Sequence, residues 1–329
     1  MESCRARYEW AMTQTTPPAL PKKLRSWADD TKKPSLGRHP DVGDITRYVA
    51  ARGALRLIER DPGVREGTDP EAVHQARVAT RRLRADLKSL EPILDRRWTK
   101  RIRDELKWLG AILGEVRELD VLQGHLNDAI SESDDLDPTG RDGDQIISVM
   151  VEQRRLRHLE LVDVMGGRRY VELLKDLVAA AQEPPLRTGV KPTKSGRKVL
   201  RKVIATSWRR TKKAADGIDD RSPVTELHEV RKRAKRARYA AELGTPVFSP
   251  DAKKLSIRIT EVQDVLGELN DAVTLATWLQ EEAPYRLDPS AAFLAGRLTE
   301  RQLQKVTALR RLWRGSWSEI KPRHTKWLR

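Results

Sequence analysis

The sequence predicts an all-α protein made of two four-helix bundles that are related by internal duplication. Three observations lead to this prediction. Apolar residues recur at helical spacing through four successive segments in each half of the chain, and no segment shows the alternation of a β-strand. Residues 73–84 return, in type and order, at 227–238. A stretch rich in proline and glycine, residues 184–196, reads as a linker between the two halves.

The first repeat is expected to cover residues 41–183. It follows an N-terminal extension, residues 1–40, which contains five prolines and no sustained helical period and is expected to be disordered or loosely docked. The spacing of apolar residues predicts helices at 44–59, 70–90, 97–127 and 145–165, the last with a continuation over 169–181. Asp69 and Pro70 are a typical N-cap and first helical residue for the second of these helices.

The second repeat is expected to cover residues 197–329. Its helices are predicted at 197–216, 223–243, 252–282 and 290–313, the last running on to 320. Ser222 and Pro223 are the expected start of the second helix, and Gly244 is its expected stop.

The third helices of both repeats carry the tripeptide Leu-Gly-Glu, with the glycines at Gly114 and Gly267. Glycine costs about 1 kcal/mol inside a helix, so its return at an equivalent place predicts close contact between helices. The glutamates of the tripeptide, Glu115 and Glu268, are expected to hold arginines from the preceding helix.

The duplicated segment forms a cationic surface when it is placed on a helix at about 100° per residue. In the first copy one face carries His74, Arg77, Arg81, Arg84 and Lys88, while alanines and leucines lie opposite. The second copy repeats this face with His228, Arg231, Lys235 and Arg238, but Glu242 stands in place of Lys88. Like charges at i+3 and i+4 repel each other, and a solvated helix would normally intersperse glutamate. The stripe therefore predicts an anionic partner.

Further arginines are candidates for the same site. Arg82 and Arg236 lie about 80° off the stripe, and each is expected either to bind the ligand or to pair with Glu115 or Glu268. Weaker candidates, which are more simply solvated charges, are two aligned pairs: Arg56 with Arg210 in the first helices, and Arg154 with Arg301 in the fourth. His74 and His228 are expected to be neutral groups that contact the ligand, with a core or capping role as the alternative.

The net charge of +16 and a pI near 10.0 indicate a polyanionic partner, which nucleic acid, an anionic membrane surface or polyphosphate would satisfy. The single cysteine, Cys4, excludes an internal disulfide framework and a multi-cysteine zinc site. The sequence has no run of eighteen apolar residues and no apolar stretch typical of a signal peptide. A soluble, cytoplasmic protein without membrane association is expected.

Catalytic chemistry finds little support in the sequence. A carboxylate-bridged metal pair needs Glu-x-x-His on two helices; Glu71 and His74 fit once, but Thr225 replaces the glutamate in the second copy. No HExxH, P-loop or GxSxG motif occurs. We therefore expect no catalytic residues, no metal and no cofactor. Sequence-specific recognition of nucleic acid is not expected either, because a stripe of Arg, Lys and His reads the spacing of negative charge and not bases.

The segments VHQARVATRRLR and LHEVRKRAKRARY, each followed by a Leu-Gly element, resemble the CHAD domain, the conserved histidine α-helical domain, over about residues 41–320. The resemblance implies two four-helix bundles related by a pseudo-twofold axis, with a basic groove or pore that binds inorganic polyphosphate, and association with polyphosphate granules. Some members are fused to a CYTH triphosphatase, whose ExExK signature is absent from this chain. The family's binding residues transfer to His74, Arg77, Arg81, Arg84, His228, Arg231, Lys235 and Arg238. Glu242 departs from the basic pattern and implies asymmetry between the halves.

The predicted function is therefore non-enzymatic binding of linear polyphosphate, with granule association and possible granule proteins as partners. Two alternatives stay open: binding of nucleic-acid backbones, and a metal-dependent phosphohydrolase that uses His74, His228 and carboxylates such as Asp120 or Asp271. A third, compatible possibility is an adaptor that polyphosphate localises while another surface recruits a partner.

Overall fold

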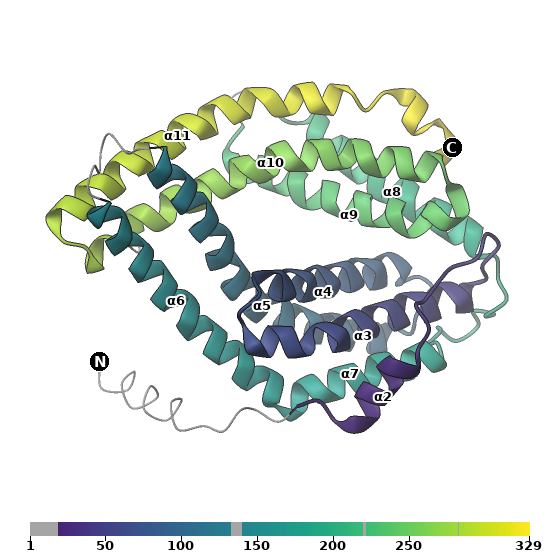
Figure 1. Cartoon of the computed structure of the whole chain (residues 1–329). Helices are drawn as coiled ribbons and strands as arrows, with labels where there is room; N and C mark the ends of the chain where they lie inside the picture. The colour runs from purple at the N-terminus through teal and green to yellow at the C-terminus, as the bar shows by residue number, and fades with distance from the viewer. Residues whose placement is uncertain (1–18, 133–139, 220–221, 282) are drawn as a thin grey trace.

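The fold is all-α, as predicted (Figure 1). The computed structural model describes residues 19–132, 140–219, 222–281 and 283–329. Within these ranges no β-strand forms, and the only extended pairing is two isolated bridges. The α-helices are α2 (Lys22–Asp30), α3 (Val42–Glu66), α4 (Pro70–Leu90), α5 (Arg96–Ser131), α6 (Arg141–Gly166), α7 (Arg168–Gln182), α8 (Gly196–Asp216), α9 (Val224–Phe248), α10 (Asp251–Glu281) and α11 (Pro289–Ser318). None of these described helices is long and apolar enough to cross a membrane.

The first half of the chain packs in sequence order, with α3 against α4 and α7, α4 against α5, and α5 against α6. Helix α4 begins as predicted: the Asp69 side chain accepts a hydrogen bond from the Glu71 backbone N–H at 2.9 Å, and Pro70 is the first helical residue. Its predicted apolar side is buried, with Ala76 and Leu83 among the core residues. Burial of that side leaves the predicted cationic side facing away from the core of the first half.

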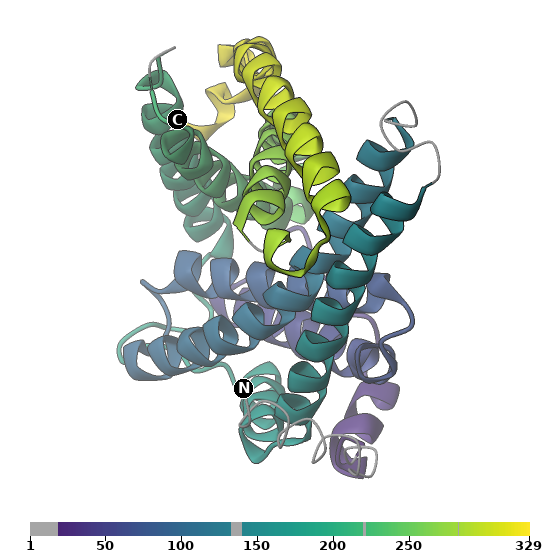
Figure 2. The same ribbon diagram turned by 90° about the vertical axis from the view of Figure 1, so that its left-hand side faces the viewer.

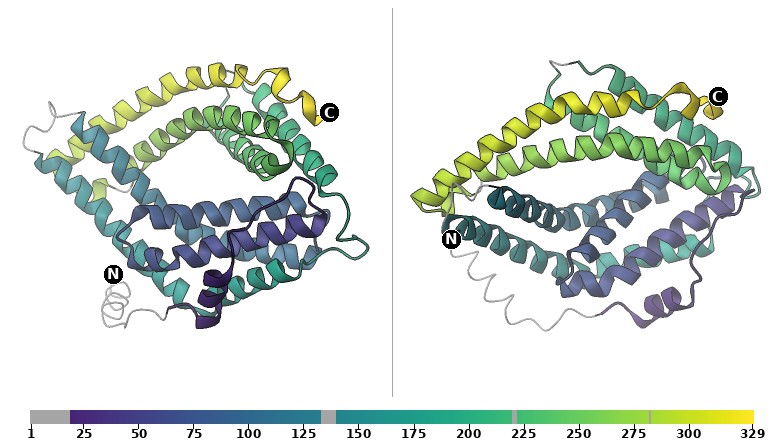
Figure 3. Two further views of the ribbon diagram at one scale, coloured as in Figure 1. Left: turned by 45° about the vertical axis from the view of Figure 1, so that its right-hand side comes forward. Right: turned by 45° about the horizontal axis from the view of Figure 1, so that its top comes forward.

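The second half repeats this order, with α8 against α9, α9 against α10, and α10 against α11. Helix α9 buries the predicted residues Val230, Ala234 and Ala237. Figures 2 and 3 show the two groups of helices, α3–α7 and α8–α11, lying on opposite sides of the molecule and meeting at its ends.

The two halves share their cores. One buried cluster joins Leu83 and Leu87 of α4 to Ile204 of α8 and Ala234 of α9. A second cluster forms where the ends of α5 and α6 meet those of α10 and α11; it contains Leu126, Met150, Leu279 and Leu294. The halves therefore share two buried clusters, while a third lies within the second half alone, and apolar packing sets their mutual orientation.

The linker between the halves is hydrogen-bonded to the first half at both of its ends. The Asp95 N–H donates to Pro185 O at 2.9 Å, and the Val42 N–H donates to Lys194 O at 2.9 Å. These backbone bonds keep the start of α8 beside the start of α3.

Two helices continue past the stops that the sequence predicts. Helix α3 includes Pro62 and runs to Glu66, because α6 holds its last turn: His158 Nε2 lies 2.8 Å from Val64 O, and Arg154 Nη2 donates to Gly67 O at 3.1 Å. Gly67 closes the helix at φ 74°, where glycine is favoured.

Helix α9 likewise includes Pro246 and runs to Phe248, instead of ending before Gly244. Its last turn is held from outside, since Arg197 donates to Val247 O at 3.0 Å and the Phe248 ring packs against Trp327. The helix also begins one residue later than predicted, because Pro223 occupies the N-cap position and Val224 is the first helical residue.

The described part of the N-terminal extension is docked and not disordered. Helix α2 places Leu24 in the buried cluster that joins α4 to α8 and α9, and Leu20, just before the helix, is buried in the same cluster. The prediction for residues 1–18 lies outside the described residues.

Candidate functional site

Helices α4 and α9 pack against each other (Figures 1 and 3). Their cationic sides meet, since Arg77 of α4 has Arg231 of α9 as a charged neighbour. Lys235 of α9 marks the meeting point, because its strongest charged neighbours are Arg81 and Arg77 of α4 together with Arg231 and Arg238 of its own helix. Burial and these four arginines lower the pKa of Lys235 to about 6. We call the set Arg77, Arg81, Arg84, Arg231 and Lys235 the central cluster.

Two arginines of the central cluster are seated over the repeated glycines. A Cβ atom on Gly114 of α5 would lie 3.4 Å from Arg77 Nη2, and one on Gly267 of α10 would lie 3.8 Å from Arg231 Nη2. The glycines thus make room for a guanidinium. The nearest groups at both glycines are site side chains that the neighbouring helices α4 and α9 contribute.

Cations of the central cluster lack carboxylate partners. Among the described residues, no ion pair with a carboxylate is formed by Arg77, Arg81, Arg84, Arg231 or Lys235, all of which are half-buried. The Nε atoms of Arg77 and Arg231 are buried and have no hydrogen-bond partner in the protein. A buried donor without a partner costs about 1–3 kcal/mol, so this arrangement favours a ligand that supplies acceptors.

Other arginines at similar depth in the molecule are paired. Ion pairs join Arg52 to Asp86 at 2.6 Å and Arg65 to Asp61 at 2.8 Å. The absence of ion pairs with carboxylates therefore distinguishes the central cluster from these two arginines.

Burial lowers the pKa of Arg77, Arg84 and Arg231, and in each case neighbouring arginines add to the effect. A guanidinium remains protonated in proteins, so the repulsion between these groups persists in the free protein. Contact with an anion would relieve it.

Helix α5 adds two arginines that the sequence reasoning missed, Arg103 and Arg117. Arg117 is a charged neighbour of both His74 and Arg77, and Arg103 is one of Arg84. The Nε atoms of both are buried without a hydrogen-bond partner. The sequence could have indicated them, because helical geometry places both within about 60° of Gly114 around the axis of α5.

The two histidines occupy equivalent places but have different partners. His228 Nδ1 lies 2.6 Å from Asn270 Oδ1; because an amide oxygen only accepts, Nδ1 donates and Nε2 is left for another bond. Burial and Arg117, opposed by Glu71, lower the pKa of His74, which is therefore neutral at pH 7. Arg77 and Arg81 of the central cluster are charged neighbours of His74, and contact of either histidine with a ligand stays a prediction.

The two carboxylates that the phosphohydrolase alternative would use, Asp271 and Asp120, are engaged. Burial raises the pKa of Asp271, but a hydrogen bond from His125 and the charge of Arg231 outweigh it, and the net shift is downward. Asp120 pairs with Arg154 at 2.9 Å. No group of three or more His, Cys, Asp or Glu side chains suited to a metal ion forms within the described ranges.

The predicted partners of Arg82 are wrong. Arg82 pairs with Glu242 of the other half at 2.7 Å, whereas Glu115 lies 3.6 Å from Arg157 of α6. Arg236 is exposed and is a charged neighbour of Arg84 across the two halves.

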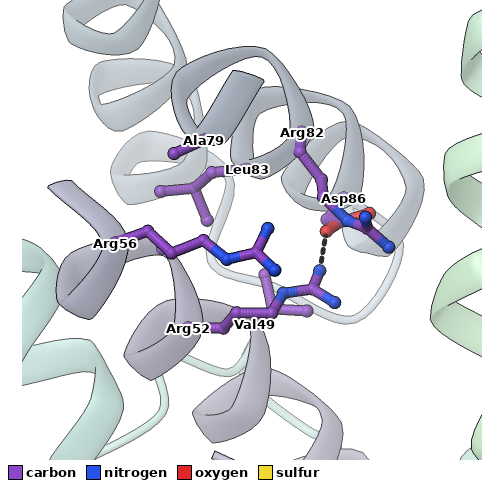
Figure 4. A pocket seen from close by; sticks show the side chains of 8 residues that line it. Val49, Arg52, Arg56, Ala79, Arg82, Leu83 and Asp86 are labelled. Carbon is purple, nitrogen blue, oxygen red and sulfur yellow. Dashed lines mark hydrogen bonds and ion pairs between the residues drawn. The ribbon is translucent and has the colours of Figure 1, made fainter. Parts of the chain in front are cut away.

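Arg56 lies outside the central cluster, in a small pocket between α3 and α4 that Arg52, Arg82 and Asp86 also line (Figure 4). Its predicted counterpart Arg210 is exposed on α8, and no hydrogen bond or ion pair joins it to the cluster among the described residues.

Three further candidates have partners elsewhere. Arg154 holds Asp120 and Gly67 O, Arg301 donates to Glu132 O at 2.9 Å, and Lys88 pairs with Glu91 at 2.5 Å. The structure does not bring these side chains into the cluster.

Comparison with known proteins identifies the family. The model of the CHAD domain matches residues 49–280. Two uncharacterized proteins from strains of Mycobacterium tuberculosis are each 30% identical over 258 residues, which cover 75% of this chain and 47% of the relative, so the chain spans about half the length of these relatives.

The CHAD domain from the plant Ricinus communis superposes with a TM-score of 0.73 at 22% identity, covering 88% of this chain and 96% of that one. PptA from Streptomyces chartreusis superposes with a TM-score of 0.69 at 22% identity, covering 84% and 99%. This chain therefore belongs to the CHAD domain family.

Proposed function

We propose that the central cluster binds inorganic polyphosphate. One observation carries the proposal: five half-buried basic side chains from α4 and α9 lie together, and among the described residues none of them forms an ion pair with a carboxylate. Phosphate oxygens would supply acceptors to the partnerless Nε atoms, and the planar guanidinium binds such oxygens in pairs. Membership of the CHAD family supports this ligand.

The side chains at the cluster favour polyphosphate over nucleic acid. Base recognition needs amide side chains or aromatic rings that are free to contact bases. Asn270 is already bonded to His228, and the Tyr239 ring is buried beneath Arg82 and Arg238. The remaining groups are cationic and contact phosphate without regard to a base.

Binding without turnover is part of the proposal. The two carboxylates that a hydrolytic mechanism would recruit are held by Arg154 and His125. Association with polyphosphate granules follows if the ligand is long-chain polyphosphate, and any granule protein would then be a neighbour on the same polymer.

Competition tests the choice of ligand. Full-length protein is bound to fluorescent long-chain polyphosphate at moderate salt, and unlabelled polyphosphate, single-stranded DNA, RNA and pyrophosphate are added at matched phosphate concentration. Polyphosphate is expected to displace the probe at the lowest concentration. Displacement by DNA or RNA at equal or lower phosphate concentration would contradict the proposal, and phosphate release in the presence of Mg²⁺ or Mn²⁺ would show turnover.

A further inference from the structure

Glu242 stands at the end of the cationic stripe of α9, in the place that Lys88 has on α4. Its carboxylate forms an ion pair with Arg82 Nη1 at 2.7 Å and a longer one with Arg238 Nε at 3.6 Å. One carboxylate thus engages a cation from each half of the molecule.

The surroundings of Glu242 differ from the central cluster in their charge balance. A second carboxylate, Asp86, pairs with Arg52 in the pocket next to Arg82, and Figure 4 shows the arginines gathered around it. Further along α4, the exposed side chain of Lys88 is paired with Glu91. Cations are therefore paired with carboxylates at this end of the stripe and unpaired in its middle.

We propose that Glu242 marks one end of the surface along which polyphosphate binds, which we call the track. Glu242 holds Arg82 and Arg238 away from the ligand and repels phosphate, so the bound chain does not continue past it. This inference rests on the proposed function. It makes Glu242 a specificity residue, because it limits how many phosphates the protein neutralises. The residues that bind are then those that form no ion pair with a carboxylate, and Lys88 lies beyond the end.

A purely structural reading is that the Arg82–Glu242 pair only clamps the two halves together. Both readings expect a lower thermal midpoint when Glu242 is changed. Only a track end expects the salt dependence of binding to become steeper, because phosphate binding releases counterions in proportion to the phosphates neutralised.

The test compares Glu242→Gln with the wild type in titrations of fluorescent long-chain polyphosphate over a range of salt. Loss of the carboxylate frees Arg82 and Arg238, so the slope of log K against log salt is expected to steepen by about 1–2, at about 0.7–0.9 for each added phosphate. Affinity at low salt is expected to rise. Glu172→Gln on α7 is the matched control, since it removes one charge from an exposed pair with Lys175 and should change neither quantity.

Lys88→Gln gives a second test that does not depend on the clamp, because Lys88 is exposed. A track that ends at Glu242 leaves the slope of this variant unchanged, whereas Arg81→Gln flattens it. An unchanged slope in folded Glu242→Gln, or equal flattening by Lys88→Gln and Arg81→Gln, would overturn the inference and leave the proposed function standing. Failure of the wild type to bind polyphosphate would overturn both.

Discussion

The guanidinium of Arg77 lies over Gly114, so that a Cβ atom on that glycine would be 3.4 Å from Nη2 and 3.5 Å from Nε. The same relationship joins Arg231 to Gly267 in the other half. Each glycine is part of the site through the arginine that it seats.

Gly114→Leu is expected to weaken polyphosphate binding about tenfold or more although no charge is removed, because the larger side chain displaces Arg77 from its seat. Gly114→Ala should bind normally, since its Cβ would make an ordinary contact, and should gain up to about 1 kcal/mol in the free energy of unfolding. Titration and thermal unfolding measure the two effects. Gly124→Leu is the control, because nothing lies within 4 Å of a Cβ at that position on the same helix; equal losses in both leucine variants would show that Arg77 is not involved.

Polyphosphate binding is expected to depend on pH through Lys235. Its pKa of about 6 lies below the ordinary lysine value of about 10.4. Free protein therefore holds Lys235 largely neutral at pH 8, while bound phosphate favours the charged form. Affinity should rise as pH falls from about 9 to about 6, by about tenfold for each unit by which binding raises the pKa of Lys235.

The same residue affects the stability of the unliganded protein with a definite sign. Between pH 6 and about 10.4 the unfolded chain binds a proton at Lys235 that the folded chain does not, so the free energy of unfolding rises with pH through this window. Lys235→Arg stays charged throughout and should flatten the pH profile of affinity. Parallel affinity profiles for this variant and the wild type would exclude Lys235 as the titrating group.

Arg154→Met is expected to lower the free energy of unfolding by about 3–5 kcal/mol, because it leaves buried Asp120 without its partner. The salt dependence of polyphosphate binding should not change, since Arg154 also holds Gly67 O and does not face the central cluster. Denaturant unfolding and titration separate these effects. A flatter salt slope at a temperature where the variant is folded would place Arg154 in the binding site after all.

Much of the fold could be predicted from the sequence because burial imposes a helical period. The buried sides of α4 and α9 are the predicted ones, and Asp69 caps α4 as predicted. The ends of α3 and α9 could not be predicted, because contacts from α6 and from Arg197 and Trp327 hold turns that contain proline.

The candidate site was predicted in part. The repeated stripe identifies the residues of α4 and α9 that the structure brings together around Lys235. Helical spacing gives no information about which residues meet across the two halves, so the pairing of Arg82 with Glu242 was missed. Arg103 and Arg117 were missed because Gly114 on their helix was interpreted as a position of helix packing and not as part of the binding site.

The most direct measurement of the central claim is the salt dependence of polyphosphate affinity for the double variant Arg77→Ala with Arg231→Ala. Its matched control is Lys22→Ala with Lys23→Ala, which removes two exposed cations from α2. A localised site predicts that the slope of log K against log salt becomes shallower by about 1.4–1.8 for the first variant, which also loses most of its affinity, while the control keeps both. Equal losses in the two variants would show that net charge alone attracts the polymer and would contradict a binding site between α4 and α9.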